Sequence, residues 1–179
     1  IDLEYNLGAE AYHFLILCQR QLYEGYFDAA MKTAMHLRDY DDLISTEEVY
    51  CLLALASCAN RSFSICSKAF IKLESCESIP EERRQIYSDL AINIFTKNPP
   101  KDSRNSTKSE CTYCETMISD WCTVCPSCHM KFPICIASGR PLMDSAQQWT
   151  CNRCNHHAYK SDVITFSNCP LCHKSLSPN

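Results

Sequence analysis

The chain has 179 residues, 46% of them hydrophobic, and a formal net charge of −4 at pH 7. This length suits one or two small domains, and the slightly acidic balance argues against binding to nucleic acid. No run of eighteen apolar residues occurs, which argues against a membrane-spanning helix, and no signal peptide is recognisable. The chain starts at Ile1 rather than methionine, which indicates a processed chain or a fragment of a longer protein.

Cysteine is the unusual component, with fifteen residues placed unevenly. Five lie in the first hundred residues and ten lie between Cys111 and Cys172. An odd total without a secretory signal speaks against a disulfide scaffold, and repeated Cys-x-x-Cys pairs indicate metal binding in a reducing compartment. The five early cysteines fall on or beside apolar helix faces, where we interpret them as small buried hydrophobic residues.

The first part of the chain has the pattern of α-helices arranged in hairpins. Apolar residues recur at three- and four-residue steps over residues 3–22, which predicts a long amphipathic helix that ends at Gly25. Three more helices are expected at residues 27–37, 46–60 and 62–74. A fifth is expected to start directly after Ser78 and to run through Ile86, Leu90, Ile94 and Phe95. We interpret His13 and His36 as surface or boundary residues of these helices.

Two capping boxes support the helix starts, one formed by Ser45 with Glu48 and one by Ser78 with Glu81. The turn at Gly25 resembles that of a tetratricopeptide repeat, with Phe27 expected to fill the gap at the turn and Ala30 expected to allow close helix approach. Residues 1–97 are therefore predicted to form an α solenoid of tetratricopeptide-like hairpins, and residues 98–110 a polar linker.

Residues 111–179 contain four Cys-x-x-Cys pairs, whose spacing predicts a small, β-rich module resembling a zinc ribbon. Each pair presents two thiolates in a tight turn, and two such turns complete the tetrahedral shell that zinc prefers. We therefore expect two structural zinc ions. The candidate ligands are Cys111, Cys114, Cys125, Cys128, Cys151, Cys154, Cys169 and Cys172.

The order in which the pairs combine is less certain from sequence. Sequential pairing is favoured over the cross-brace of RING-type folds, because the gap from Cys128 to Cys151 is long and no ligand histidine lies between them. Cys122 and Cys135 are left over, and either could substitute at the first site. Four histidines beside the ligands are interpreted as flanking polar residues: His129, His156, His157 and His173.

A saturated four-thiolate shell has no open position for water, so these ions are expected to be structural rather than catalytic. The module has few large apolar residues and therefore needs the metal to fold. Those predicted to pack around the hairpins are Trp121, Phe132, Ile134, Ile136, Trp149, Val163, Ile164 and Phe166.

Several stretches are similar to a known family. Together they resemble the C-terminal region of a WD-repeat subunit of the intraflagellar transport A complex, and the resemblance covers nearly the whole chain. The stretches are residues 21–34, 66–73, 89–97, 149–154, 169–173 and the segment Pro133-Ile-Cys-Ile-Ala-Ser-Gly-Arg-Pro.

The resemblance implies N-terminal β-propellers, a long helical solenoid and a zinc-binding tail. It also implies a scaffold that contacts other subunits of that complex in the cytoplasm, the cilium and the ciliary basal body. Retrograde ciliary transport and import of ciliary membrane proteins would be its roles.

Three functions are distinguished from the sequence. A non-enzymatic assembly module, with no direct membrane insertion, is favoured. A RING-like ubiquitin ligase at the end of a solenoid is the alternative, and it requires the cross-brace. Nucleic-acid binding is disfavoured, because residues 111–179 contain only five Lys or Arg. No nucleophile–base pair or phosphate-binding loop suggests catalysis.

Overall fold

The computed structural model describes residues 2–101 and 107–176 and divides into two compact units. The helical unit comprises Phe14–Asn105, and the cysteine-rich unit comprises Ile1–His13 together with Ser106–Asn179. The first helix contributes residues to both units. None of the described helices is long and apolar enough to cross a bilayer.

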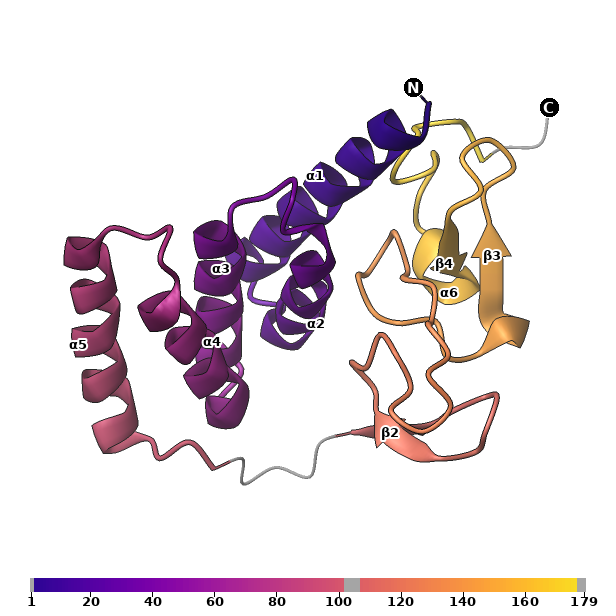
Figure 1. The fold of residues 1–179 in the computed structure, drawn as a ribbon. Helices are drawn as coiled ribbons and strands as arrows, with labels where there is room; N and C mark the ends of the chain where they lie inside the picture. The colour runs from indigo at the N-terminus through magenta and orange to yellow at the C-terminus, as the bar shows by residue number, and fades with distance from the viewer. Residues whose placement is uncertain (1, 102–106, 177–179) are drawn as a thin grey trace. The chain divides into compact units, whose positions relative to one another are not determined.

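Five α-helices and one short 3₁₀ helix follow one another through the first part of the chain (Figure 1). Within the helical unit each helix packs against the next, so that α2, α3, α4 and α5 form a row. This confirms the predicted tetratricopeptide-like solenoid. The bounds are α1 Asp2–Tyr23, α2 Phe27–Leu37, η1 Arg38–Tyr40, α3 Thr46–Ala59, α4 Phe63–Ser75 and α5 Glu81–Lys97.

Helix α1 ends in a Schellman motif, in which a left-handed residue lets two amide groups reach back to the last turn. Gly25 has φ of +83°. The Tyr26 N–H donates to the Gln21 carbonyl at 2.8 Å, and the Gly25 N–H donates to the Leu22 carbonyl at 3.2 Å. The sequence prediction that Gly25 ends the helix is therefore confirmed.

Helix α3 ends in the same motif, thirty-six positions further along the chain. Arg61 adopts the left-handed conformation with φ of +59°. The Ser62 N–H donates to the Ser57 carbonyl at 2.8 Å, and the Arg61 N–H donates to the Cys58 carbonyl at 3.0 Å. The two hairpins therefore repeat one geometry, although different residues occupy the left-handed position.

The same offset relates a pair of helix contacts in the two hairpins. In the first hairpin the Cys18 thiol donates to the Ala30 carbonyl at 3.4 Å, and in the second the Cys66 thiol donates to the Ala54 carbonyl at 3.5 Å. Cysteine and alanine exchange helices between the two repeats. Because both side chains are small, either order lets the helices approach closely. Ala30, Cys18 and Cys66 are fully buried, as predicted, whereas the other three early cysteines, Cys51, Cys58 and Cys76, are only partly buried.

Helix α5 completes the row through polar and aromatic contacts. Tyr87 on α5 donates to the Glu47 carboxylate on α3 at 2.6 Å, and Arg83 pairs with the same carboxylate at 3.0 Å. The rings of Phe70 and Phe95 meet edge to face at 5.9 Å. Burial, the hydrogen bond with Cys51 and the one with Glu47 together raise the pKa of Tyr87, so the phenol stays protonated as the donor.

Three details of the helical unit correct the sequence analysis. Ser45 caps α3, accepting from the Glu48 N–H at 3.2 Å, but Ser78 does not cap α5. The N-cap of α5 is Pro80, because a proline disfavours helical geometry in the residue before it and so delays the helix start. Phe27 is 39% exposed and does not fill the turn.

The third correction concerns His36, which was expected near the surface and is buried at 4% exposure. The buried face of α2 is broad enough to include it. Its ring meets the edge of Phe14 with centroids 4.7 Å apart, and its Nε2 lies 3.1 Å from the Tyr40 hydroxyl. The Tyr40 hydroxyl gives Nε2 a polar partner inside the aromatic cluster, and Nδ1 lies 3.6 Å from the Asp39 carboxylate, beyond hydrogen-bond distance.

The cysteine-rich unit contains two short antiparallel hairpins. Strand β1 (Lys108–Glu110) pairs with β2 (Met117–Ser119), and β3 (Gln148–Thr150) pairs with β4 (His157–Tyr159). The 3₁₀ helix η2 (Ser145–Gln147) precedes β3, and the short helix α6 (Lys160–Val163) follows β4. Strand β1 begins three residues before the predicted start of the module at residue 111.

The core of this unit is small. Of the eight apolar residues predicted to pack here, Phe132, Ile136 and Val163 are buried. Ile164 is 81% exposed, because it follows the end of α6, where Val163, the last residue of the helix, takes the inward position. Trp121, Ile134, Trp149 and Phe166 are partly buried. Three further large apolar residues that were not predicted to pack here are buried: Ile118, Leu142 and Met143.

Candidate metal centres

Each Cys-x-x-Cys pair lies in a turn with one shared pattern of backbone hydrogen bonds, here called a knuckle. The first cysteine donates its N–H to the carbonyl five residues later, and its own carbonyl accepts from the N–H four residues later. That fourth residue is left-handed in every case. These residues are Glu115, His129, Asn155 and His173, with φ of 60°, 60°, 58° and 58°.

The knuckles orient their two thiols differently. The first cysteine of each is buried, with exposure of 1% or less, and belongs to the core of the unit. The second is exposed in Cys128 and partly exposed in Cys114, Cys154 and Cys172. Each centre therefore has an inner side made by the protein core and an outer side near solvent.

The first centre brings together Cys111, Cys114, Cys125 and Cys128, whose sulfur atoms all lie within 4.8 Å of one another. The Sγ atoms of Cys111 and Cys128 are 3.8 Å apart, and those of Cys114 and Cys125 are 3.6 Å apart. Cys111 and Cys125 pack with Ile118, Phe132 and Met143 in one apolar cluster.

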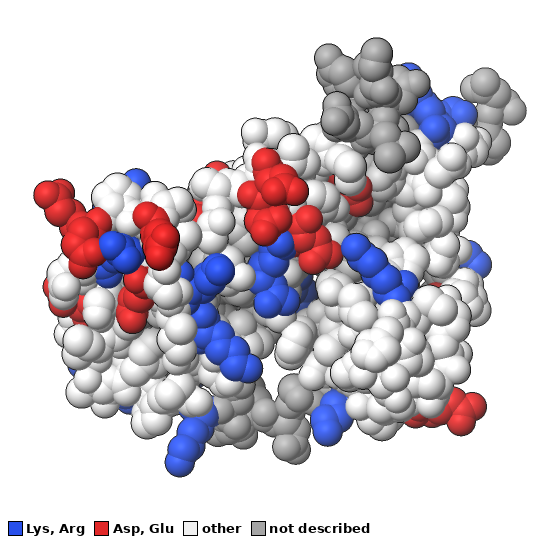
Figure 2. Space-filling view, viewed as in Figure 1, with Lys and Arg blue, Asp and Glu red and all other residues white. Residues whose placement is uncertain are grey.

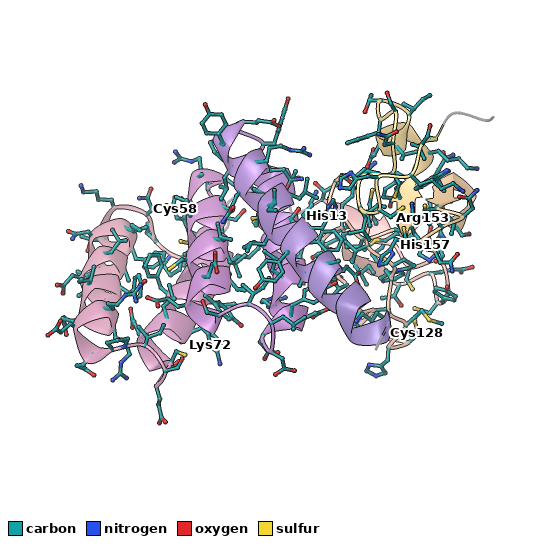
Figure 3. The ribbon with its side chains drawn as sticks, turned by 90° about the horizontal axis from the view of Figure 1, so that it is seen from above. His13, Cys58, Lys72, Cys128, Arg153 and His157 are labelled. Atoms are coloured by element: carbon teal, nitrogen blue, oxygen red, sulfur yellow. The ribbon has the colours of Figure 1, made fainter. Side chains whose placement is uncertain are left out.

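The second centre has the same construction around β3 and β4. It brings together Cys151, Cys154, Cys169 and Cys172, again with all sulfur atoms within 4.8 Å. The Sγ atoms of Cys151 and Cys172 are 3.6 Å apart, and those of Cys154 and Cys169 are 3.8 Å apart. In Figure 3 the label of Cys128 marks the first centre. The label of Arg153, which lies in the sequence between Cys151 and Cys154, marks the second.

These sulfur separations can be tested against the geometry of zinc. A tetrahedron with Zn–S bonds of about 2.3 Å has edges of about 3.8 Å, which matches the 3.6–3.8 Å separations. A disulfide would place two sulfur atoms about 2.05 Å apart. All fifteen cysteines carry free thiols. The donor set therefore fits two tetrahedral zinc ions and not disulfide bridges.

The structure combines the knuckles in chain order, first with second and third with fourth. The cross-brace that a RING-type fold requires does not form. Cys122 and Cys135 lie outside both clusters among the described residues. No histidine in the described part of the chain joins either cluster. His129 and His173 occupy the left-handed knuckle positions, and the ring of His156 contacts the Cys154 carbonyl at 2.9 Å.

Four thiols held this close perturb one another. The side-chain hydrogen bond with Thr116 lowers the pKa of Cys114 to about 6. For Cys128 a backbone hydrogen bond at Met130 lowers the pKa, but partial desolvation of this exposed thiol and its hydrogen bonds with the neighbouring cysteines outweigh that effect and raise the pKa to about 12. Without a cation, thiolates this close repel one another, so one ionises easily only when another does not.

The second centre has the same imbalance. For Cys151, burial raises the pKa, but backbone hydrogen bonds from Cys154 and Arg153 and side-chain bonds with the other thiols outweigh it and lower the pKa to about 6. For Cys154, burial is the main cause of a raised pKa. A divalent cation at the centre of such a cluster removes the repulsion and lets every ligand ionise.

The chemistry available to these centres is structural. Four thiolates saturate a tetrahedral ion, leaving no position for a water molecule or a substrate. Zinc-finger peptides show the size of this stabilisation, because binding of structural zinc contributes about 10–16 kcal/mol to their folding. A unit with so few large buried side chains depends on a contribution of that kind.

The chain matches two family models, and its curated relatives include WD repeat-containing protein 35 from three mammals. Residues 4–102 match the family described as IFT121-like, TPR repeats, and residues 133–177 match the family described as IFT121, second zinc finger domain. WD repeat-containing protein 35 is 50% identical over 169 residues in Rattus norvegicus and in Mus musculus, and 48% identical in Homo sapiens.

These matches cover 94% of this chain but 13% of each relative. The chain therefore spans a small part of the length of the proteins it resembles. The helical match agrees with the helical hairpins, and the zinc-finger match contains the whole second centre. By its repeats, its cysteine centres and its identity to these relatives, the chain belongs to the IFT121-like family.

Proposed function

We propose that this chain is a non-enzymatic assembly module of an intraflagellar transport A subunit. The observation that carries the proposal is the identity of 48–50% to WD repeat-containing protein 35 over 94% of the chain. Through this module the subunit would contact other subunits of the complex, supporting retrograde ciliary transport and import of ciliary membrane proteins. Its proposed locations are the cytoplasm, the cilium and the ciliary basal body.

Two proposed domains and a linker organise the module: residues 1–97 form the helical repeats, 98–110 the linker and 111–179 the zinc-binding part. The proposed zinc ligands are the eight cysteines of the two clusters. Helical repeats supply extended surfaces for protein partners, and saturated zinc centres supply rigid turns. Neither feature needs a substrate, which favours a scaffold over an enzyme.

The charge distribution favours protein partners as well. The chain carries 17 Lys and Arg against 21 Asp and Glu. On the face drawn in Figure 2, acidic and basic side chains are mixed between large uncharged areas. A nucleic-acid-binding surface would instead gather basic residues along one stripe. The RING-like ligase alternative loses its structural basis, because the knuckles combine in chain order.

Co-purification from ciliated cells tests the proposal. A full-length relative carrying Cys151→Ser at the matching position should lose other subunits of the complex, because the second centre can no longer hold its ion. Cys122→Ser is the matched control, since Cys122 lies in the same unit outside both clusters. Intact assembly of the Cys151→Ser protein, with its zinc lost, would contradict a role of this module in assembly.

A further inference from the structure

A fifth turn in the cysteine-rich unit has the backbone of a knuckle. The Cys135 N–H donates to the Arg140 carbonyl at 3.0 Å, and the Gly139 N–H donates to the Cys135 carbonyl at 2.7 Å. Gly139 is left-handed, with φ of +76°. Ile134 and Pro141 form an antiparallel bridge. Each of these features recurs, at the same spacing, in the four cysteine pairs.

The bridge is the clearest sign of the shared register. In every turn the residue before the first cysteine pairs with the residue six positions after that cysteine. The five pairs are Glu110 with Met117, Val124 with Lys131, Ile134 with Pro141, Thr150 with His157, and Asn168 with Ser175. The segment 134–141 thus matches the metal-binding turns in its backbone hydrogen bonds, its left-handed residue and its bridge pairing.

The two ligand positions of this fifth turn differ from the others. Cys135 occupies the first position and is fully buried, as the first cysteine is elsewhere. Ser138 occupies the second position. A serine hydroxyl is a poor zinc ligand beside thiolate sulfur, and within residues 2–101 and 107–176 no second knuckle supplies this one with a further pair of thiols. The turn has the shape of a metal site without its donor set.

A carboxylate from α6 lies where the side chains of these two positions converge. Asp162 Oδ2 accepts from the Ser138 hydroxyl at 2.6 Å and from the Cys135 thiol at 3.5 Å. The Arg140 guanidinium clamps the same carboxylate, with Nε 3.2 Å from Oδ2 and Nη2 2.9 Å from Oδ1. Such a two-point contact fixes the orientation of the carboxylate.

Tyr159 holds the second side of this arrangement. Its N–H donates to the Cys135 sulfur at 3.3 Å, and its hydroxyl donates to the Pro141 carbonyl at 2.8 Å. The Arg140 guanidinium lies over its ring, 4.0 Å from the centroid. The arginine is therefore fixed between a carboxylate and an aromatic face. Burial raises the pKa of Cys135, which keeps its thiol protonated as a donor.

We propose that residues 134–141 form a fifth, metal-free knuckle, in which the Asp162 carboxylate takes the place of the metal ion and Arg140 balances its charge. The polarity of the centre is reversed relative to zinc. In the other knuckles electron-rich sulfur atoms surround a cation, whereas here S–H, O–H and N–H donors surround an anion. The fifth knuckle therefore ties the turn to α6 without binding metal.

Converting the turn into a metal site tests this assignment. In the 179-residue chain, Ser138→Cys/Arg140→Ala supplies a second thiol and releases the Asp162 carboxylate. Cys135, the new thiol and Asp162 would then offer three ligands. We expect this variant to bind three Co²⁺ per chain, against two for the unmodified chain. The matched control is Ser145→Cys/Arg140→Ala, which adds a thiol at an exposed position and should remain at two.

The unmodified metal content keeps the inference testable even when the double variant does not fold. Cys135→Ala and Asp162→Asn should each retain two zinc ions, because neither residue is a ligand in the natural chain. A third ion in the unmodified chain, or loss of an ion from either single variant, would overturn the proposal. So would a folded Ser138→Cys/Arg140→Ala variant that still binds two.

Discussion

Replacing one buried ligand of the second centre gives the sharpest test of the zinc assignment. Cys169 is fully buried, and its sulfur lies 3.8 Å from that of Cys154. If four ligands share about 10–16 kcal/mol, each contributes about 2.5–4 kcal/mol. Since 1.4 kcal/mol corresponds to a tenfold change, Cys169→Ser should weaken zinc binding at this centre by about two to three orders of magnitude.

A competition titration against a chromophoric chelator of known affinity measures this loss. The unmodified chain should withhold two zinc ions from the chelator, and Cys169→Ser should withhold one. Cys122→Ser should behave like the unmodified chain, because Cys122 packs beside the first centre without joining it. Two tightly held ions in Cys169→Ser, or one in Cys122→Ser, would show that the ligand sets are assigned incorrectly.

Three further outcomes are expected. Among the cysteines outside the two metal centres, labelling of the zinc-loaded chain with a disulfide reagent at pH 8 should begin at Cys76, whose hydrogen bond with Ser78 lowers its pKa. It should reach Cys18 and Cys66 last, because burial raises the pKa of both thiols to about 12. Cys76→Ser should abolish the fastest phase. Gly25→Ala should lower the free energy of unfolding by about 1–2 kcal/mol in thermal denaturation, because a residue with a side chain is strained at a φ of +83°. The loss should stay within that range, because no heavy atom among the described residues lies within 4 Å of the added carbon. Phe132→Ala should cost about 3–5 kcal/mol in chemical denaturation at buffered zinc, because its side chain is fully buried in the small core.

The helices were predictable because two independent signals agree along most of the chain. Apolar residues at helical spacing located the buried faces, and Ser45 and Gly25 marked a start and an end that the structure confirms. The prediction at Ser78 was wrong because the capping-box pattern was read without Pro80, which takes the N-cap itself. Local signals therefore compete, and a proline limits where a helix can begin.

Tertiary packing explains the features that periodicity missed. His36 is polar, so its position on α2 predicted a boundary residue, yet the Tyr40 hydroxyl and the Phe14 ring complete its environment. Phe27 is apolar and was expected inside, yet it is partly exposed at the first residue of α2. Neither outcome depends on helical spacing alone, because both depend on which neighbour covers the position.

The eight sulfur atoms came together as their spacing suggested, since each pair lies in a tight turn and a short hairpin can join two turns in succession. The fifth knuckle was not predicted from the sequence, in which Cys135 stands as a cysteine without a Cys-x-x-Cys partner. A local signal was present in Gly139, which stands where each metal-binding turn has a left-handed residue. Asp162 could not be found this way, because it lies twenty-four residues beyond Ser138 and reaches it only in the folded unit.

The two ligand positions of a knuckle have different roles, one in core packing and one in metal binding. This difference explains why cysteine is replaced at only one of the two positions in the fifth knuckle. The first cysteine is buried in all five turns, so it serves as a small core residue whether or not it binds metal. The second points toward the outer side in the metal-binding turns, where its main contribution is the metal bond. Once no ion is bound, the second position can become Ser138 and hydrogen-bond to Asp162, whereas Cys135 must still fill the core.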